Sequence, residues 1–527
     1  MKRSSWLEPA LLLLIMALAA YLRLWRVAET PGWFSDEGTH LEIARHLLDG
    51  RIQYLSVTQS TLLFARLPLF EWLLAGVARL FGLGMGTLRS VTAVLGTLSV
   101  ALLYAMLRDI SKDRWLALTA ALLLAVFPAA VIYSRFGFSY NLLVPLLLVA
   151  LWGLYRYANG SQVGLVWAAG AIGLALITDL WAISLLPILV LVVVWHNWRD
   201  AWWGLLIAWL PLGVFTAVSL LTVPDAYLFD WQFTLSRVRL PLIAQLRNLT
   251  TNMVTLLSQS GWLAVGVVGI FAIKPARLQK LVWLFLLVPF VVIGRTAALY
   301  SLSFYYTIPL LPWLALSGAA LVRHGTGRFT DASNGKTAFS PRRAQRTQSF
   351  LWRYFFSVPS ASSAINFFRS ATDAKGWSIL LLAGLLVGGS SWLLARQVNG
   401  QVETAVDPFL IEANAAQETA DFLNAHIQPE DLVIASPTLA WMINGRVADF
   451  QLAALASGNE TPHIPTDLPA ERQLFDADYQ QARFVVIDQL WHNWAQFNVP
   501  GVAQIMAEVA QWPLVFESGN VQVYENQ

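Results

Sequence analysis

The sequence predicts a mainly α-helical, polytopic membrane protein that ends in an extracytoplasmic α/β domain. Of its 527 residues, 57% are hydrophobic and only 13% are charged, whereas soluble domains carry about 25% charged residues. Long apolar segments recur up to residue 395, and the composition becomes mixed beyond it. We therefore divide the chain into a transmembrane domain, residues 1–395, and a C-terminal soluble domain, residues 396–527.

Eleven apolar segments approach the length of about 20 residues that crosses a bilayer. They lie near 6–25, 88–107, 115–133, 140–157, 162–178, 180–196, 201–222, 256–273, 280–297, 302–322 and 377–395. The first follows Met1-Lys2-Arg3, as the apolar part of a signal peptide would, but no small-x-small cleavage site precedes Asp36. We therefore expect this segment to be a retained first span.

One further apolar segment, residues 67–82, is shorter and carries Glu71 and Arg79. If it lies on the outer interface without crossing, the basic loops fall on the cytoplasmic side, as the positive-inside rule requires. The loop 323–375, with nine Lys or Arg and two Asp, is the most basic of them. This topology places the N-terminus in the cytoplasm and both the loop 26–87 and the C-terminal domain outside. The expected location is the bacterial plasma membrane.

The C-terminal domain shows alternating helix and strand patterns. Residues 414–426 and 502–511 have helical patterns, and residues 431–435 and 483–488 have the apolar runs of buried strands. Residues 521–524 would form a last edge strand. Alternation of this kind is typical of a compact α/β unit.

Composition excludes several classes of function. The net charge of +3 comes without an interleaved basic and aromatic patch, so nucleic acid is not an expected partner. The chain has no Cys, which excludes disulfides and thiolate chemistry. Its seven His show no metal-binding spacing. We expect no metal ligands and assign no cofactor, although a divalent metal stays open.

The acidic pair Asp36-Glu37 follows the first span, in the outer loop. Ser35 is the expected N-cap of an amphipathic helix over 36–48 that lies on the membrane surface. One interpretation is a capped surface helix and no more. The other makes the pair a general base where water meets a lipid-borne substrate. His40, one turn after Asp36, could orient the carboxylate or make an ordinary polar contact.

Several Arg residues fall on the outer side, opposite to the positive-inside preference. They are Arg66, Arg89, Arg135, Arg237, Arg239, Arg247 and Arg295. A single outer Arg could extend its side chain to the interface. A group of them in a chain so poor in charge indicates an anionic ligand at the outer face.

The order of these features resembles the GT-C glycosyltransferases, in particular protein O-mannosyltransferases and the aminoarabinose transferase (glycosyltransferase family 39-like). Asp36-Glu37 matches an acidic pair of that family, and Arg66-Leu67-Pro68-Leu69 is similar to its His/Lys-Pro-Pro-Leu helix. Arg89 resembles the Arg at the start of the next span. The resemblance covers residues 1–322.

Two later motifs extend the resemblance. Ser134-Arg135 looks like a Ser-Arg-x-x-x-x-Asp element, although Tyr140 or Asn141 stands where the acid would be. Residues 304–312, which include Tyr305 and Tyr306, are similar to a Tyr-x-x-Pro-x-x-Pro span.

The resemblance implies an enzyme, a hexosyl- or pentosyltransferase of class EC 2.4, that moves a sugar from a polyprenyl-phosphate-linked donor to a hydroxyl acceptor. Transfer would be inverting and extracytoplasmic, with Asp36 as general base and Glu37 orienting the acceptor or holding the sugar. The implied donor-phosphate ligands are Arg66, Arg89, Arg135 and Arg295, and the implied substrate-lining residues are His40, Asn141, Tyr305 and Tyr306.

Two other classes of function stay open. A transporter or flippase of lipid-linked sugars is the main alternative, but such proteins usually show inverted repeats or charges at the bilayer midplane. A non-catalytic scaffold would explain the C-terminal domain but not the outer Arg residues. The acceptor, whether protein, lipid or glycan, is open.

Overall fold

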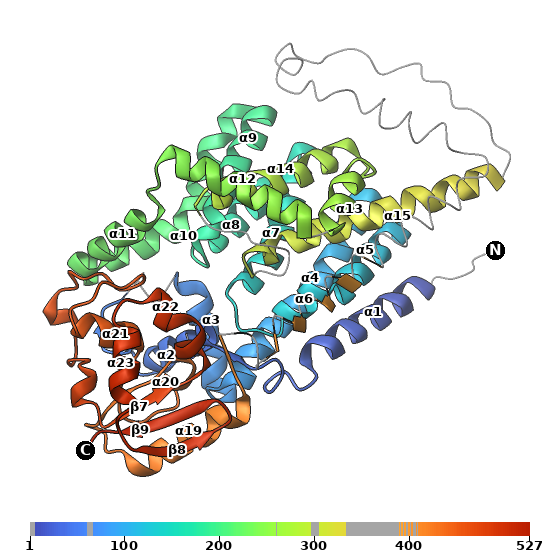
Figure 1. Ribbon diagram of the computed structural model, residues 1–527. Helices are drawn as coiled ribbons and strands as arrows, with labels where there is room; N and C mark the ends of the chain where they lie inside the picture. The colour runs from blue at the N-terminus through green and yellow to red at the C-terminus, as the bar shows by residue number, and fades with distance from the viewer. Residues whose placement is uncertain are drawn as a thin grey trace.

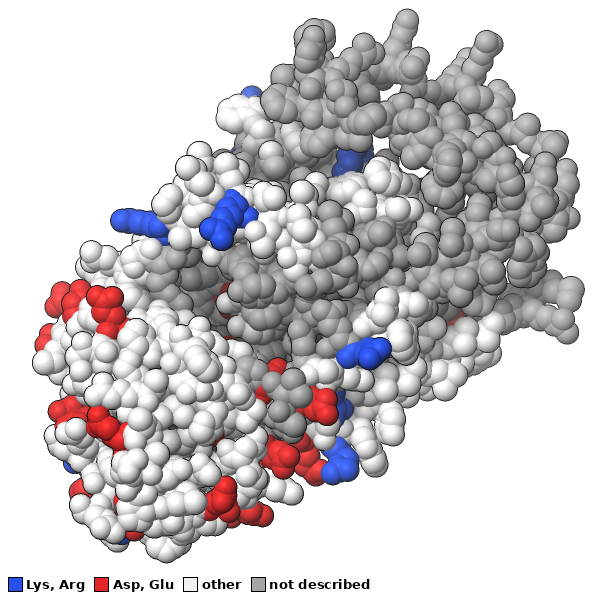
Figure 2. Space-filling model, in the orientation of Figure 1, with Lys and Arg blue, Asp and Glu red and all other residues white. Residues whose placement is uncertain are grey.

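The computed structural model describes residues 6–60, 67–259, 261–296, 305–333 and 409–527, and, between them, 389, 392–393, 395–396, 399–400, 402–403 and 407. Figure 1 shows a bundle of long helices at one end and an α/β domain that contains the C-terminus at the other. On the face shown in Figure 2, acidic side chains gather mostly on the C-terminal domain.

The bundle follows the apolar segments of the sequence. Its helices are α1 (Leu7–Leu24), α4 (Met85–Ser111), α5 (Arg114–Val126), α6 (Pro128–Tyr133), α7 (Tyr140–Ala158), α8 (Gln162–Leu176), α9 (Leu185–Asn197), α10 (Ala201–Thr222), α13 (Gly261–Ile270), α14 (Ala276–Gly294) and α15 (Leu311–Ser333), with the short 3-10 helices η1 (Leu180–Ser184), η2 (Trp198–Asp200) and η3 (Tyr305–Leu310). In the described part of the chain, six helical segments are long and apolar enough to cross a membrane. The protein is an integral membrane protein.

Two predicted spans differ from the observed helices. The segment 115–133 is divided into α5 and α6 because Pro128 lacks an N–H and cannot continue the helix of α5. The segment 256–273 contains the end of α12 (Leu242–Gln259) and the ten-residue α13. Most of the predicted span 377–395 and of the basic loop 323–375 lies outside the described residues.

The loop 26–87, which the sequence predicts to be the outer loop, contains two helices and a short hairpin. Helix α2 (Ser35–Leu48) precedes β2 (Gln53–Tyr54) and β3 (Val57–Thr58), and α3 (Pro68–Phe81) follows. The 14 residues of α3 rise about 21 Å, which is less than the roughly 30 Å of a hydrocarbon core. One face of α3 is buried while Trp72, Leu80 and Phe81 are exposed, as expected of a helix that does not cross.

Helix α2 corrects one prediction. Ten of its fourteen residues are buried, whereas a helix on a membrane surface would expose its polar face. Helix α3 covers it on one side and α20 (Pro437–Ala440) of the C-terminal domain on another. The predicted interfacial helix is therefore an internal helix between the two parts of the molecule.

The C-terminal domain is built on a five-stranded mixed sheet of order β6-β5-β7-β9-β8. Its elements are α19 (Ala413–His426), β5 (Leu432–Ile434), α20, β6 (Arg446–Ala448), α21 (Phe450–Ala456), η4 (Ala470–Arg472), η5 (Tyr479–Gln481), β7 (Phe484–Ile487), the π-helix η6 (Trp491–Ala495), α22 (Gln496–Asn498), α23 (Val502–Val509), β8 (Leu514–Ser518) and β9 (Val521–Glu525). Strands β5, β6 and β7 are parallel, and β9 is antiparallel to β7 and β8.

The predicted helices and strands of this domain are confirmed with small shifts at their ends, but β9 is not an edge strand. It pairs with β7 on one side and with β8 on the other. Strand β8, which the sequence pattern did not indicate, forms the edge, and the turn before β9 contains Gly519 with φ +57°. Glycine adopts such positive φ without steric cost.

The C-terminal domain is joined to the outer loop by backbone contacts. Strand β1 (Trp33–Phe34) pairs antiparallel with β4 (Leu410–Ile411). Gly38 of α2 lies so close to Pro437 that a Cβ atom at position 38 would be 1.9 Å from the Pro437 carbonyl oxygen. Side chains of α2, α3 and the C-terminal sheet share one hydrophobic cluster. The outer loop is thus part of the core of the C-terminal domain.

Candidate active site

The two acids of the pair Asp36-Glu37 have different surroundings. Both lie in the first turn of α2, which begins at Ser35. Ser35 is the first helical residue and not the predicted N-cap, because Phe34 precedes the helix and its N–H donates to Glu37 Oε2 at 2.9 Å. Glu37 is fully buried, whereas Asp36 is half-exposed. Of the two acids, Asp36 alone is partly accessible from outside the protein.

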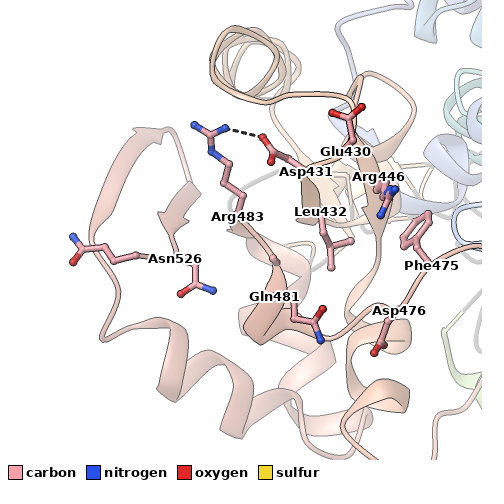
Figure 3. Close-up of a pocket in the computed structure, with 11 residues that line it drawn as sticks. Glu430, Asp431, Leu432, Arg446, Phe475, Asp476, Gln481, Arg483 and Asn526 are labelled. Atoms are coloured by element: carbon pink, nitrogen blue, oxygen red, sulfur yellow. Dashed lines mark hydrogen bonds and ion pairs between the residues drawn. The ribbon is translucent and has the colours of Figure 1, made fainter.

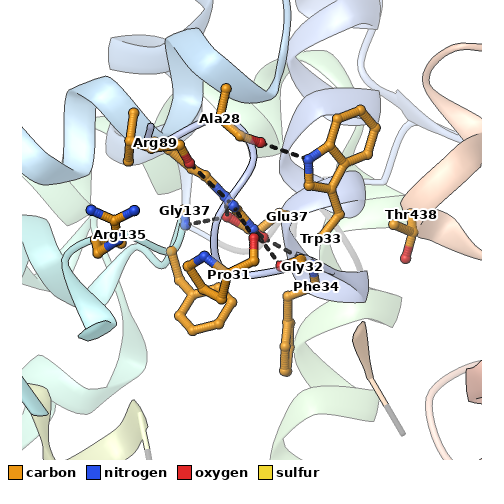
Figure 4. A network of polar contacts seen from close by, with 12 residues as sticks. Ala28, Pro31, Gly32, Trp33, Phe34, Glu37, Arg89, Arg135, Gly137 and Thr438 are labelled. Atoms are coloured by element: carbon orange, nitrogen blue, oxygen red, sulfur yellow. Dashed lines mark hydrogen bonds and ion pairs between the residues drawn. The ribbon is translucent and has the colours of Figure 1, made fainter. Parts of the chain in front are cut away.

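Glu37 accepts four hydrogen bonds (Figure 4). Its Oε1 accepts from Arg89 Nε and from the Gly137 N–H, both at 2.7 Å. Its Oε2 accepts from Arg89 Nη2 at 2.5 Å and from the Phe34 N–H. A carboxylate has about four acceptor sites, and all of them are used here. This corrects the prediction that Glu37 orients an acceptor or holds a sugar.

All N–H groups of the Arg89 side chain donate to atoms of the protein itself. Its Nη1 donates to the carbonyl oxygens of Val27 at 3.2 Å and Pro31 at 2.7 Å, and its Nη2 donates to that of Gly32 at 2.7 Å. Together with the two bonds to Glu37, these account for the five N–H groups of a guanidinium. No donor is left for a phosphate, so the predicted phosphate contact of Arg89 is wrong. Arg89 holds the loop before α2 in place.

Arg135 has a similar role on the same loop. It is buried, and its Nε and Nη2 donate to the Thr30 carbonyl oxygen at 3.2 and 2.6 Å. Its Nη1 donates to the Leu22 carbonyl oxygen at 2.9 Å. Figure 4 shows Arg135 and Arg89 near the same loop. The predicted phosphate contact of Arg135 is corrected to a structural one.

Two predicted substrate-lining residues are buried and hydrogen-bonded to other groups of the protein. His40 is fully buried, and its Nδ1 hydrogen-bonds to Glu71 Oε1 of α3 at 2.6 Å. Asn141 is buried, and its amide donates to the carbonyl oxygens of the preceding loop. The cavity that Asn141 lines has a volume of about 20 Å³, which holds one water. Neither residue lines a substrate site as predicted.

The aromatic pair Tyr305 and Tyr306 stays a candidate substrate wall. Both are half-exposed at the start of η3. The Tyr305 ring stacks on Phe138 at 4.9 Å between centroids and meets Phe34 edge-on at 6.2 Å. Phe34 is two residues before Asp36, so this aromatic group lies beside the start of α2.

Two predicted phosphate ligands remain, Arg295 and Arg66. Arg295 is exposed at the end of α14, where its Nη1 donates to Gln245 Oε1 of α12 at 3.4 Å. Arg66 lies outside the described residues.

Two buried or partly buried charges were not among the predicted site residues. Arg23 is buried at the end of α1 and donates to the carbonyl oxygens of Leu124 and Ala125, which Pro128 deprives of regular helical partners. Asp179, in the turn before η1, accepts from the Trp181 N–H at 2.8 Å and from Ser139 Oγ at 3.4 Å. A charged residue next to an apolar span is the signal that could have found both.

Two other features of the described residues bear on ligands. No group of three His, Asp or Glu among them is arranged to hold a metal ion. A groove of about 470 Å³, shown in Figure 3, lies where β5 and β7 begin and is lined by Arg446, Phe475 and Arg483. The opposite end of β5 leads to α20, which packs against α2, so the groove is separate from the candidate active site.

Known proteins share this fold. Residues 65–226 match the family model of dolichyl-phosphate-mannose-protein mannosyltransferases. The chain superposes on ArnT from Cupriavidus metallidurans bound to undecaprenyl phosphate with a TM-score of 0.62 and 16% identity, over 98% of both chains. The chain has a GT-C fold. The oligosaccharyltransferase of Archaeoglobus fulgidus in its apo form matches 92% of the chain and 70% of its own, with 13% identity and a TM-score of 0.51. No curated protein matches in sequence.

The comparison with ArnT confirms the GT-C resemblance and extends it. The motifs supported it over residues 1–322, whereas the structural similarity covers 98% of the chain and so includes the C-terminal domain.

Proposed function

We propose that the protein is a glycosyltransferase that moves a sugar from a polyprenyl-phosphate-linked donor to a hydroxyl acceptor on the extracytoplasmic face of the membrane. Three findings support the proposal: the match of residues 65–226 to the mannosyltransferase family model, the GT-C fold, and the undecaprenyl phosphate bound by ArnT. The observation that carries it is the half-exposed Asp36, next to the fully buried Glu37. The buried ion pair fixes the start of α2 and so the position of Asp36.

The proposed step is an inverting displacement at the anomeric carbon. Asp36 accepts the proton of the acceptor hydroxyl as the acceptor oxygen forms its bond to that carbon. The bond between the anomeric carbon and the phosphate oxygen breaks, and its electron pair leaves with the polyprenyl phosphate. Asp36 then passes the proton to water. A phosphate is a good leaving group, so this step needs no general acid.

The cations for the donor phosphate are fewer than the sequence indicated. Arg89 and Arg135 donate to the protein itself, which leaves Arg295 and Arg66 from the predicted set. Arg295 is exposed, and Arg66 stays a prediction from the sequence. Both are proposed to stabilise the negative charge that develops on the departing phosphate. Tyr305 and Tyr306 would flank the donor.

The test is transfer by the purified protein in lipid vesicles. Undecaprenyl phosphate carrying radiolabelled mannose, glucose or 4-amino-4-deoxyarabinose serves as donor, with a hydroxyl-bearing acceptor mixture. We expect Asp36→Asn to lower turnover at least 100-fold, in line with the usual worth of a general base. Asp49→Asn is the matched control, because Asp49 follows the other end of α2 and its exposed side chain pairs only with Arg51 within the described contacts.

The outcomes separate the two classes of function. Equal turnover of Asp36→Asn and the unmodified protein would remove Asp36 from the base role. Movement of the labelled lipid between the two leaflets, with its bond to the sugar intact and no labelled acceptor, would replace the transferase by a flippase.

A further inference from the structure

The loop before α7 needs an amide at position 141. Asn141 Nδ2 donates to the carbonyl oxygens of Tyr133 at 2.9 Å, Phe136 at 3.3 Å and Phe138 at 3.2 Å. A carboxylate has no proton to donate when ionised, so an Asp here would place negative charge against three carbonyl oxygens. An Asp at position 141, one of the two positions where this resemblance puts the acid, is therefore incompatible with the hydrogen bonds of the loop, and Tyr140 stands at the other.

A carboxylate from another element lies against the same loop. Asp179 is half-exposed in the turn between α8 and η1. Its Oδ2 accepts from Ser139 Oγ, two residues before Asn141, at 3.4 Å. That distance is long for a bond between a hydroxyl and a carboxylate. A carboxylate has about four acceptor sites, so Asp179 can accept a substrate hydroxyl beside Ser139 Oγ. The Oδ1 atom is held by the Trp181 N–H at 2.8 Å, which fixes the side chain.

The loop before α7 and helix α3 each contact both the turn that carries Asp179 and helix α2, which carries Asp36. The loop that carries Ser139 also donates the Gly137 N–H to Glu37 at 2.7 Å. Helix α3 joins α2 through the bond between His40 and Glu71, and its Leu69 N–H donates to the Ile177 carbonyl oxygen at 2.9 Å, two residues before Asp179. These contacts place the turn with Asp179 and the start of α2 around one region.

We infer that Asp179 is a second carboxylate of the active site and binds a hydroxyl group of the donor sugar. The inference rests on the proposed function. A carboxylate accepts strongly from sugar hydroxyls, whereas it repels the donor phosphate, and its fixed Oδ1 makes it a poorer mobile base than Asp36. Asp179 supplies a carboxylate from a different loop, where Tyr140 and Asn141 supply none.

The experiment compares two lipids, undecaprenyl phosphate and undecaprenyl phosphate mannose, with the glucose and aminoarabinose forms as further sugar-bearing probes. Asp179→Asn keeps an oxygen for the Trp181 N–H, since Asn caps helices as well as Asp does, and removes only the charge. We expect about a tenfold rise in both Kd and KM for the preferred sugar-bearing lipid, from a lost hydrogen bond to a charged group. Binding of undecaprenyl phosphate itself should not change.

Asp478→Asn is the matched control, because Asp478 caps the 3-10 helix η5 in the same way, through the Gln480 N–H, but lies in the C-terminal domain. Asp179→Ser, which keeps capping ability, provides a second variant if Asp179→Asn unfolds. Unchanged Kd and KM for the sugar-bearing lipid in a folded Asp179 variant, while Asp36→Asn is inactive, would overturn this inference alone. A protein without transferase activity on any of the three donors would overturn the proposed function and this inference with it.

Discussion

Arg89 and Glu37 form a fully buried, bidentate ion pair that connects the second long helix of the bundle with the first turn of α2. The guanidinium donates twice to the carboxylate and three times to backbone carbonyl oxygens of the loop before α2. Because every hydrogen-bonding group of both side chains is used, the pair has a structural role. Its function is to hold Asp36, which precedes Glu37, in one position.

Loss of one partner of this pair should destabilise the protein strongly. Arg89→Ala leaves the Glu37 carboxylate buried without a counter-charge, which costs about 3–5 kcal/mol. Arg89→Lys should recover only part of this, since an ammonium has three donors without the planar fork of guanidinium. The measurement is the midpoint of thermal unfolding in detergent, followed by tryptophan fluorescence.

The control for Arg89 is Arg51→Ala. Arg51 pairs with Asp49 at 2.8 Å on the surface, and an exposed pair of this kind contributes at most about 1 kcal/mol. If Arg89→Ala unfolds at the same temperature as Arg51→Ala, the buried pair does not have the role assigned to it.

Gly38 is the contact point between α2 and the C-terminal domain. A Cβ atom at position 38 would meet the Pro437 carbonyl oxygen at 1.9 Å and the Thr438 Cα at 2.6 Å, and both are backbone atoms that cannot rotate away. Gly38→Ala should therefore separate α20 from α2 and shift Asp36. We expect loss of transferase activity and faster cleavage between the domains in limited proteolysis.

Gly76→Ala is the matched control for Gly38→Ala. Gly76 lies inside α3, and nothing is within 4 Å of its added Cβ. Alanine has the higher helix propensity, by about 1 kcal/mol, so Gly76→Ala should be neutral or slightly stabilising. Equal activity of the two variants would show that the contact at Gly38 tolerates a side chain.

The sequence alone predicted those helices and strands that contain long apolar runs. The apolar runs of α1, α4 and α14 and the buried strands β5 and β7 lie close to the predicted ranges. Strand β8 has no such signal, because its residues are only partly buried and it is held by pairing with β9. Its place in the sheet depends on a contact and not on its own composition.

The partners of the charged residues could not be read from the sequence. Positive charges on the outer side indicated an anion, and the anion of Arg89 is Glu37, 52 positions away, not a bound phosphate. The same holds for His40, whose partner Glu71 is 31 positions away. A pattern shows that a charge needs a partner, but whether the protein or a ligand supplies it depends on the tertiary fold.

Arg472 joins the C-terminal domain to α11 (Pro224–Val238) through a second buried ion pair. Its Nη1 donates to Asp230 Oδ1 at 2.7 Å, and both side chains are buried. Arg472→Ala should lower the free energy of unfolding by about 3–5 kcal/mol, because the buried ion pair with Asp230 is broken. The double variant Arg472→Met, Asp230→Leu should recover most of this loss. Thermal unfolding of the three proteins checks the prediction, and equal midpoints for Arg472→Ala and the double variant would contradict it.

Asp449 makes the stability of the C-terminal domain depend on pH. Burial raises the pKa of Asp449 to about 6, compared with about 3.9 for an unperturbed Asp. The folded state therefore binds more protons than the unfolded state between pH 4 and 6, and the free energy of unfolding falls as pH rises through this range. Two pKa units correspond to about 3 kcal/mol.

Asp449→Asn should remove the contribution of Asp449 to this dependence and stabilise the protein at pH 7.5, since Asn can still accept the N–H groups of Gln451 and Leu452 that Asp449 Oδ1 accepts. Asp431→Asn provides the opposite sign, because hydrogen bonds from the Gln428 N–H and Arg483 lower the pKa of Asp431 and its charge stabilises the fold at higher pH. The measurement is the midpoint of thermal unfolding of the unmodified protein and of both variants at pH values from 4.5 to 7.5. A fall with pH in Asp449→Asn as steep as in the unmodified protein would show that the buried carboxyl of Asp449 is not the source of the effect.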